Sequence, residues 1–386
     1  MHTRSKFRLL VVRLGAMGDI LHALPAVTAL RQMHPEWVID WVVEPRWRAL
    51  LAAESFVSQG LKPGDSFSKA VGTAEAMPFQ NGRNPAQPVV DRLHLAATKE
   101  WRKTPLRSGT LHEIKDLRQA LRAEGYDVSL DLQGAVRSAT IARLAGCRRR
   151  IGEAEPREAA ARVFFTEQVA TQGAHVIEQD IELAAAVAGD DLKHVQPWLP
   201  VDVVAEAWAD ALLNSGPGSA VGQPAVLINP GAGWGAKRWP VERYADVAQA
   251  LSRRGLRVVV NAGPGEEPLA EAIVSGSGGA AIAVNCSLDQ LIALTRRVRL
   301  AIAGDTGPLH LACALGKPVV GIYGPTDPSR NGPYGTEFRV LRSPESCRDH
   351  TRHKEPEAGL LTIQPDEVIA AADELLKTKD MKEAIA

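Results

Sequence analysis

The sequence predicts an α/β protein built from two doubly wound domains, and three observations support this fold class. Segments rich in β-branched residues alternate with segments of helical spacing over the first part of the chain. The same alternation starts again after a Gly-, Pro- and Ser-rich stretch near residue 214. In addition, 386 residues exceed the usual size of a single hydrophobic core. Alternating strands and helices are typical of parallel sheets covered by helices on both faces.

The first block opens with an apolar run over 7–14, which is expected to form a strand buried on both faces of a sheet. A segment of helical spacing follows over 19–35, and a second strand is expected over 37–44. Further predicted elements are a helix over 112–126, a strand over 127–134 and a helix over 135–146. We therefore assign the first domain to 1–195, with an irregular Gly- and Pro-rich insertion at about 65–88.

The second block repeats the pattern after an expected interdomain linker over 196–223. Strands are predicted over 225–231, 256–263, 300–307 and 317–325, and helices over 241–255, 288–298, 308–316 and, last, about 365–377. The second domain is therefore assigned to 224–386. Because ligands of doubly wound sheets bind outside the carboxyl ends of the strands, we expect the site in the cleft between the domains.

Charge and cysteine content exclude several function classes. Lysine plus arginine and aspartate plus glutamate both number 45, which leaves no global positive field for a nucleic acid. The four cysteines form no CxxC pair, so the sequence predicts neither a zinc site nor a disulfide framework and fits a reducing cytoplasm. No apolar run approaches the roughly 18 residues of a membrane helix. We expect a soluble protein that at most lies on a membrane surface.

The turn after the first expected strand carries two glycines and an acid. Gly15 and Gly18 form a GxxG pattern, which lacks one glycine of the dinucleotide fingerprint. Asp19 follows at the start of a helix, where the helix dipole favours a carboxylate. Two interpretations stay open here: a residue that only stabilises the helix start, and a carboxylate directed into the cleft for chemistry.

Two segments of the second block are candidates for binding phosphate. The first, 229–240, contains three glycines followed by Lys237, although it lacks the GK[ST] of a Walker A loop. The second contains Asp305, Thr306 and Gly307, with Pro308 at a helix start and His310 in its first turn. The alternatives are a flexible turn with a solvated basic pair, and an ordinary helix cap. Together the two segments favour a phosphate site.

Two further groups of charged residues are candidates for ligand contacts. Glu266 and Glu267 follow a glycine turn at a strand end, where a carboxylate can accept ribose hydroxyls or cap the next helix. Basic residues are in excess over 99–150 and suggest an anionic partner, although they can equally be solvated arginines. They include Arg102, Lys103, Arg107, Lys115, Arg137 and the run Arg148, Arg149 and Arg150.

Three segments, taken together, resemble the glycosyltransferase family 9 heptosyltransferases: 13–27, 229–240 and 304–328. The resemblance extends from about residue 8 to about residue 377, fails at the insertion and is vague over 345–364. The segment 100–139 is similar to the first-domain segment of members that add the first heptose to the lipopolysaccharide core.

The resemblance implies a GT-B fold, in which two Rossmann-like domains face each other across a cleft. It implies inverting transfer of heptose from ADP-L-glycero-D-manno-heptose to the Kdo-lipid A inner core, without a metal or other cofactor. The implied partners are the ADP-heptose donor and Kdo₂-lipid A at a membrane surface, and no nucleic acid. We expect a monomer that is cytoplasmic and peripheral on the cytoplasmic face of the inner membrane.

The resemblance also implies which residues form the site. The resemblance implies that Asp19 is the catalytic base and that Glu266 or Glu267 contacts the donor. Gly233 stands where the family often has a hydroxyl residue, so backbone N–H groups would serve there. The implied ligands of the donor phosphates are Lys237, Asp305, Thr306, Gly307 and His310. The basic residues expected to face the acceptor's carboxylates and phosphates are Arg102, Lys103, Lys115 and Arg137; no metal ligands are predicted.

Three alternative functions remain. A heptosyltransferase II-type enzyme shares the donor motifs and adds a later heptose. A GT-B-like sugar-nucleotide epimerase would use the same phosphate site without an acceptor. A nucleotide-sugar sensing module would bind the donor without releasing ADP. The basic excess and Asp19 argue against the last two.

Overall fold

A computed structural model describes residues 6–53, 88–215, 222–349, 351 and 353–385. The chain divides into two compact units. Unit 1 comprises Met1–Gly173 with Ile177–Pro200, and unit 2 comprises Ala174–Val176 with Val201–Ala386. The insertion expected at about 65–88 lies outside the described residues, apart from its last residue.

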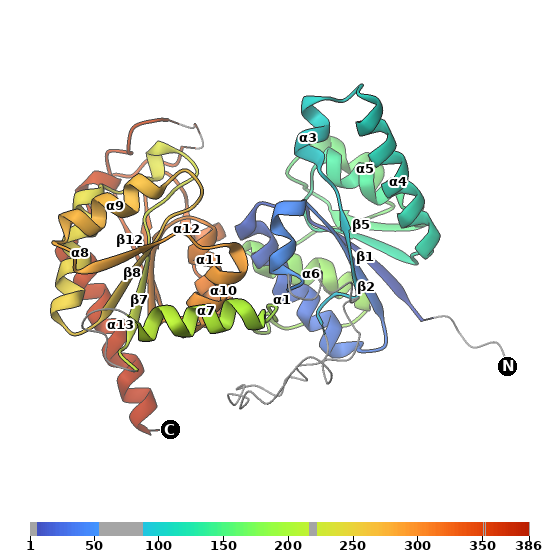
Figure 1. Cartoon of the computed structure of the whole chain (residues 1–386). Helices are drawn as coiled ribbons and strands as arrows, with labels where there is room; N and C mark the ends of the chain where they lie inside the picture. The colour runs from blue at the N-terminus through green and yellow to red at the C-terminus, as the bar shows by residue number, and fades with distance from the viewer. Residues whose placement is uncertain (1–5, 54–87, 216–221, 350, 352, 386) are drawn as a thin grey trace. The chain divides into compact units, whose positions relative to one another are not determined.

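Unit 1 is built on a parallel six-stranded sheet with the order β3-β2-β1-β4-β5-β6 (Figure 1). Its strands are β1 (Arg8–Val12), β2 (Val38–Val43), β3 (Arg92–Leu95), β4 (Val128–Asp131), β5 (Arg149–Glu153) and β6 (Glu167–Val169). Its helices are α1 (Met17–Met33), α3 (Thr98–Lys103), α4 (Ser108–Glu124), α5 (Val136–Leu144) and α6 (Val176–Ala188), with 3₁₀ turns η1 (Pro45–Leu50) and η3 (Ala159–Phe164).

Unit 2 holds a second parallel six-stranded sheet, with the order β12-β11-β10-β7-β8-β9. Its strands are β7 (Ala225–Asn229), β8 (Arg257–Asn261), β9 (Ala281–Val284), β10 (Leu300–Gly304), β11 (Val319–Tyr323) and β12 (Phe338–Arg342). Its helices are α7 (Val203–Asn214), α8 (Val241–Arg253), α9 (Glu267–Gly276), α10 (Leu288–Arg297), α11 (Gly307–Ala314), α12 (Pro328–Asn331) and α13 (Pro365–Ile385), with 3₁₀ turns η4 (Gly235–Lys237) and η5 (Leu360–Thr362).

The two sheets share one topology, which confirms the predicted doubly wound α/β fold class. Counted within each unit, the strand order is 3-2-1-4-5-6 in both. The order reverses between β1 and β4 in unit 1 and between β7 and β10 in unit 2. At such a point the connections leave to opposite faces of the sheet, which opens a crevice at the carboxyl ends of the two strands.

The sequence analysis missed the strands at both edges of each sheet, β3 and β6 in unit 1 and β9 and β12 in unit 2. They are three to five residues long, and most of their residues are only partly buried. Edge strands are kept short and polar, so they lack the continuous apolar run that reveals a central strand. Strand β5, whose sequence RRIGE also lacks such a run, was not predicted either. The other central strands have the run, and their predicted positions are confirmed.

For the basic run at 148–150 the sequence left two interpretations open, an anionic partner and solvated arginines. In the structure two of these arginines belong to strand β5 and bind their neighbours. The Arg149 Nε–H donates to Glu167 Oε1 at 2.6 Å, and the Arg150 Nε–H donates to the Phe164 carbonyl at 2.7 Å. These guanidinium groups hold the β5–β6 edge together.

Part of the range expected as a linker forms helix α7, which packs on α10 in unit 2. The Arg296 Nη1 lies 2.5 Å from Glu206 Oε1, and the Arg297 Nε–H donates to Asp210 Oδ1 at 2.5 Å. Ala205, which belongs to α7, is buried. The segment 201–215 therefore belongs to the second unit.

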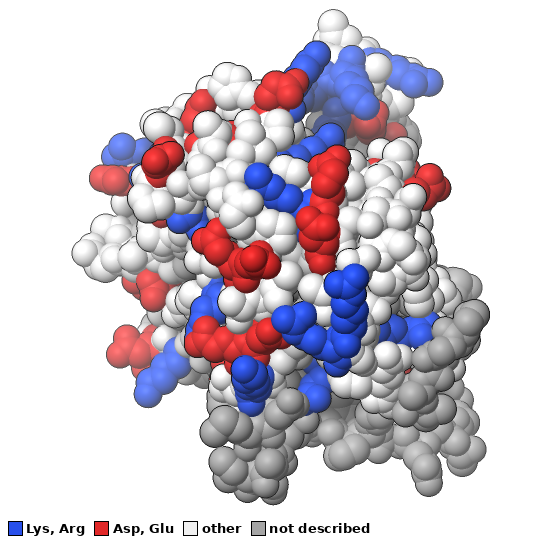
Figure 2. Space-filling model, turned by 90° about the vertical axis from the view of Figure 1, so that its left-hand side faces the viewer, with Lys and Arg blue, Asp and Glu red and all other residues white. Residues whose placement is uncertain are grey.

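The charges that balance in the sequence are also mixed in space. Figure 2 shows a face on which acidic and basic side chains are interspersed, without a continuous field of either sign. Ion pairs such as Arg254 with Asp373, 3.0 Å apart, account for part of this mixing. On this face, any strong local field therefore comes from a few side chains.

A buried carboxylate fixes the turn after β4, at the point where the strand order of unit 1 reverses. Asp131 Oδ1 accepts hydrogen bonds from the backbone N–H groups of Gln133 and Gly134, both at 2.8 Å, and from the Ser138 hydroxyl at 3.1 Å. Gln133 Oε1 in turn accepts from the Leu14 N–H at 2.8 Å. The two turns that flank the crevice are thus joined.

Burial raises the pKa of Asp131 to about 6, even though its hydrogen bonds and the charge of Arg13 act in the opposite direction. The raised pKa means that the folded protein holds a proton on this group more tightly than the unfolded chain does.

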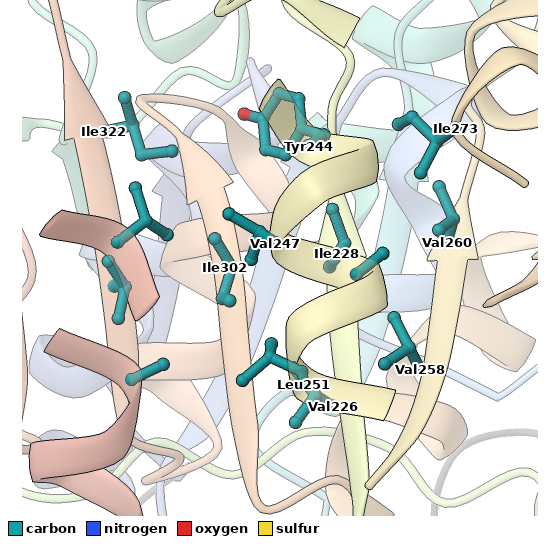
Figure 3. Packing of buried hydrophobic residues seen from close by; sticks show 14 of the residues in the cluster. Val226, Ile228, Tyr244, Val247, Leu251, Val258, Val260, Ile273, Ile302 and Ile322 are labelled. Atoms are coloured by element: carbon teal, nitrogen blue, oxygen red, sulfur yellow. The ribbon is translucent and has the colours of Figure 1, made fainter. Parts of the chain in front are cut away.

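The core of unit 2 shows how the helices are held on the sheet. Tyr244, Val247 and Leu251 recur at helical spacing along α8 and face the sheet (Figure 3). They pack against side chains of three strands, namely Val226, Ile228, Val258, Val260 and Ile302. This apolar stripe fixes α8, and with it the turn that precedes the helix.

We expect Leu251→Ala to lower the free energy of unfolding by about 2–5 kcal/mol, because the fully buried side chain leaves a cavity. Leu106→Ala is the matched control: this leucine is 88% exposed, and its loss should cost less than about 0.5 kcal/mol. Urea denaturation followed by circular dichroism measures both. Equal losses in the two variants would contradict the packing described.

We expect Asp131→Asn to change how stability depends on pH. In the wild type the unfolded chain ionises first, near the ordinary value of 3.8, so stability falls as pH rises from there to about 6 and the loss persists above it. The loss is about 2–3 kcal/mol for a shift of this size. The amide keeps an oxygen for the three hydrogen bonds and carries no charge.

The difference in unfolding free energy between the variant and the wild type should therefore grow in favour of the variant between pH 4 and pH 6. Denaturation at a series of pH values measures it. Parallel pH profiles for the two proteins would show that Asp131 titrates normally.

Candidate functional site

Asp19 lies in the first turn of α1, directly after the crevice-forming end of β1. Its Oδ2 accepts a hydrogen bond from the Ala16 N–H at 2.9 Å, and its Oδ1 lies 3.5 Å from Arg13 Nη2. The side chain is 37% exposed, whereas Arg13 is buried. One carboxylate oxygen therefore stabilises the helix start, as the first interpretation predicts, and the group as a whole remains open to solvent.

The turn that carries Asp19 requires a glycine. Gly15 has a φ of +142°, and a Cβ at this position would meet the indole ring of Trp47. The Arg46 guanidinium lies 4.4 Å from the centre of the same ring. The glycine thus lets the β1 turn approach the turn that follows β2.

Cationic side chains gather at the same edge of the unit 1 sheet. The pKa of Lys99 is lowered by burial, and further by the charges of Arg46, Arg137 and Arg102. Glu44 lies among them and is buried; its Oε1 accepts from the Thr98 hydroxyl at 2.5 Å and from the Lys99 N–H at 3.1 Å. Four positive charges so close together form a site suited to an anion.

This cluster includes only two of the four basic residues predicted from the sequence. Arg102 and Arg137 belong to it, whereas Lys103 is exposed and pairs with Glu100 at 2.8 Å. Lys115 lies exposed on α4. The sequence analysis missed Arg46 and Lys99, which follow the ends of β2 and β3. A search for cations just after each predicted strand would find Arg46; β3 itself was not predicted.

In unit 2, a buried cluster joins the turns after β7 and β10. The Lys237 ammonium pairs with Asp305 Oδ2, and also lies 3.3 Å from the Asp305 carbonyl oxygen. Asp305 Oδ1 lies 3.3 Å from His310 Nε2. The Lys237 Nζ is also 4.4 Å from the centre of the Trp234 ring. Lys237 is therefore a fixed cation and not part of a solvated pair.

The charge state of Asp305 follows from these contacts. Burial alone would raise its pKa, but the hydrogen bond and charge of His310 and the charge of Lys237 outweigh burial and hold the pKa well below its usual range. The carboxylate remains ionised and keeps its two partners in position.

The start of α11 has no side-chain cap. Thr306 occupies the N-cap position, but its hydroxyl donates to the Gly304 carbonyl at 3.2 Å and caps none of the first-turn amides. Asp305 is engaged by Lys237 and His310. The ordinary-cap alternative is therefore wrong for these two residues, and Gly307 begins the helix next to the Lys237 cluster.

Glu266 and Glu267 point to different neighbours. Glu266 Oε2 accepts from the Gly263 N–H at 3.2 Å, and its carboxylate lies so close to Gly231 that a Cβ there would overlap it. Glu267 Oε1 accepts from Gly265 N–H at 3.2 Å and from Asn285 Nδ2 at 2.8 Å. Glu266 is thus the acid directed toward the glycine-rich turn after β7. Gly233 is exposed in that turn, with open space around it.

The η4 turn is also held by a segment that sequence reasoning did not single out. The Ala236 N–H donates to the His353 carbonyl at 3.1 Å, and the Glu357 N–H donates to the Ala236 carbonyl at 3.2 Å. A Cβ at Gly235 would overlap the Lys354 carbonyl. The backbone around 353–357 therefore fixes the turn that ends in Lys237.

Comparisons with known proteins agree with these features. Residues 114–360 match the family model described as glycosyltransferase family 9 (heptosyltransferase). Lipopolysaccharide heptosyltransferase 1 of Escherichia coli K12 is 30% identical over 348 residues, which cover 87% of this chain and 94% of the relative. The Pseudomonas aeruginosa protein of the same name is 27% identical over 347 residues, covering 88% of this chain and 85% of the relative.

The solved structure described as E. coli heptosyltransferase WaaC with ADP is also similar. Its TM-score is 0.72 at 26% sequence identity, and the match covers 96% of this chain and all of that one. In the part of the chain that the structure describes, we find no helix long and apolar enough to cross a bilayer. The matched family model spans more than half of the sequence, and the chain belongs to glycosyltransferase family 9, the heptosyltransferases.

Proposed function

We propose that this protein is an inverting heptosyltransferase that moves heptose from ADP-L-glycero-D-manno-heptose to the Kdo-lipid A inner core of lipopolysaccharide. The observation that carries the proposal is the Lys237–Asp305–His310 cluster beside the uncapped start of α11, in a chain of this family. Solved relatives are described with ADP and with ADP-2-deoxy-2-fluoro heptose. Unit 2 binds the donor in this proposal, and unit 1 supplies the base and the acceptor site.

The donor site provides positive charge before the reaction begins. The Lys237 ammonium and the first-turn amides after Thr306 and Gly307 stabilise the diphosphate as it leaves. Asp305 and His310 act by holding Lys237 and the start of α11 in place. Glu266 accepts the ribose hydroxyls, and backbone N–H groups near Gly233 contact phosphate oxygens. These groups supply the charge that the leaving group needs, so we propose transfer without a metal.

Asp19 acts as the general base. The acceptor hydroxyl oxygen attacks the anomeric carbon from the face opposite ADP, the bond to the diphosphate oxygen breaks, and ADP leaves with the electron pair. The hydroxyl proton moves to Asp19, which must lie about 2.6–3.2 Å from that oxygen. One displacement inverts the anomeric carbon and needs no second carboxylate. Arg13, beside Asp19 Oδ1, keeps the carboxylate oriented.

The cationic cluster of unit 1 suits the acceptor. Kdo carboxylates are planar and lipid A phosphates are tetrahedral, and guanidinium groups bind both through paired N–H donors. Arg46, Arg102 and Arg137 supply such donors, and Lys99 adds an ammonium group. Lys103, at the end of α3, and Lys115, on α4, add further positive charge in this proposal. We propose that the protein works as a monomer, peripheral to the cytoplasmic face of the inner membrane.

The first test is ADP release from ADP-heptose with Kdo₂-lipid A, compared with the heptosylated product of that reaction, in the presence and absence of EDTA. We expect release with Kdo₂-lipid A, none with the heptosylated product, and no effect of EDTA. Release only with the heptosylated acceptor would favour the heptosyltransferase II-type alternative. Conversion of the donor sugar without acceptor would identify an epimerase, and binding without release a sensor.

Replacing Asp19 should abolish transfer without preventing donor binding. Asp19→Asn keeps an oxygen for the Ala16 N–H but cannot take the proton, so we expect turnover to fall roughly 10²–10⁴-fold. The dissociation constant for ADP, measured by calorimetry, should stay within about twofold. Asp116→Asn, at an exposed carboxylate of α4, serves as the control with normal turnover. Full activity of the Asp19 variant would eliminate this residue as the base.

Replacing Lys237 should mainly weaken donor binding. Loss of a charge-assisted contact to phosphate corresponds to about a 10- to 100-fold rise in the dissociation constant for ADP in Lys237→Ala. Arg238→Ala removes the neighbouring, exposed cation and should change ADP affinity by less than about twofold. If the two variants bind ADP equally well, the buried cluster does not bind the diphosphate.

A further inference from the structure

The connection between α3 and α4 exposes an apolar side chain to an unusual degree. Leu106 is 88% exposed, and Leu111, in the first turn of α4, is 54% exposed. Two exposed leucines on one short connection form a candidate contact surface. We call residues 102–111 the hairpin tip.

The hairpin tip is held firmly by the rest of unit 1. The Trp101 Nε1–H of α3 donates to Glu113 Oε2 of α4 at 2.6 Å, and the Thr104 and Thr110 hydroxyls are 3.2 Å apart. Leu117 and Leu121, further along α4, are buried in the unit 1 core. Figure 1 shows α3 and α4 side by side. The tip therefore presents Leu106 without a large loss of conformational freedom on binding.

The charge around the tip selects the chemistry of a partner. In this neutral protein, residues 99–122 contain seven lysines and arginines against three acidic residues. Arg107 follows Leu106 directly, and Arg102 and Lys103 precede it by four and three residues; all three are exposed, and Lys103 pairs with Glu100. An exposed apolar side chain with an excess of cations close by in the sequence is suited to a surface with an apolar interior and anionic groups outside it.

Other exposed apolar residues lack this setting. Val203 and Val204 at the start of α7 are 53% and 69% exposed, but acidic Asp202 and Glu206 lie beside them in the sequence. Val163 in η3 is 76% exposed, with Glu158 and Arg162 nearby in sequence. Among the described residues, the hairpin tip is thus where high apolar exposure coincides with a cationic excess.

We propose that the hairpin tip docks on an anionic lipid bilayer, with Leu106 entering the apolar layer and the surrounding cations contacting lipid phosphates. The inference rests on the proposed function, because the acceptor there is anchored in a membrane. Docking places α3, which carries Lys99 and Arg102 of the cationic cluster, close to the lipid phosphates. The hairpin tip is thus the part of unit 1 that contacts the membrane in this proposal.

The test is binding to vesicles of phosphatidylcholine containing about 30% phosphatidylglycerol, measured by co-sedimentation. Leu106→Asp should weaken binding about ten- to hundredfold, since it removes one buried leucine and adds a repelled charge. Val163→Asp is the matched control and should bind within about twofold of the wild type. Arg107→Glu should also weaken binding, and more salt should weaken the wild type. Vesicles of phosphatidylcholine alone should bind all four proteins weakly.

A second measurement separates this proposal from the enzymatic one. Heptose transfer to a soluble, acyl-free acceptor should be unchanged in Leu106→Asp, and thermal melting should show an intact fold. If Leu106→Asp and Val163→Asp bind vesicles equally, the docking proposal is overturned, whatever the transfer assay shows. If the wild type binds vesicles through the tip but transfers no heptose to either acceptor, docking stands and the proposed function fails.

Discussion

The reversal of strand order in each sheet is the constraint on which the rest of the structure depends. Where neighbouring strands send their connections to opposite faces, the backbone leaves a crevice that no helix covers. In unit 1 Asp19 follows β1 and Asp131 ends β4, and in unit 2 Lys237 and Asp305 follow β7 and β10. The same topology thus serves two kinds of chemistry, because the turn residues differ while the scaffold does not.

Buried charge is tolerated in these turns because each group has partners. A carboxylate removed from water costs several kcal/mol unless opposite charges or donors compensate. Asp305 receives Lys237 and His310, and Asp131 receives two backbone amides and a hydroxyl. The charged partners of Asp305 outweigh burial and keep its carboxylate ionised, whereas the donors around Asp131 offset burial only in part, so the pKa of Asp131 stays raised. The chain has equal numbers of acidic and basic residues, and yet individual buried carboxyls have strongly shifted pKa values.

The parts of this structure that could be predicted are those set by local pattern. Apolar runs such as 7–14 revealed the central strands except β5, and the motifs around Asp19, Lys237 and Asp305 revealed the turns where the strand order reverses. The edge strands could not be found, because their short, polar sequences resemble loops. The pairing of Arg149 with Glu167 and the gathering of Arg46 with Lys99 depend on contacts between distant segments, which no local pattern records.

The contact between Gly235 and the Lys354 carbonyl has a consequence for the evolution and engineering of this family. The backbone at Gly235 packs directly against the backbone at Lys354, so neither segment can change its length or side-chain size without affecting the other. A chimaera that imports only the 229–240 loop from a relative would bring a turn without the segment that supports it. Grafts meant to alter donor preference should therefore exchange both segments together.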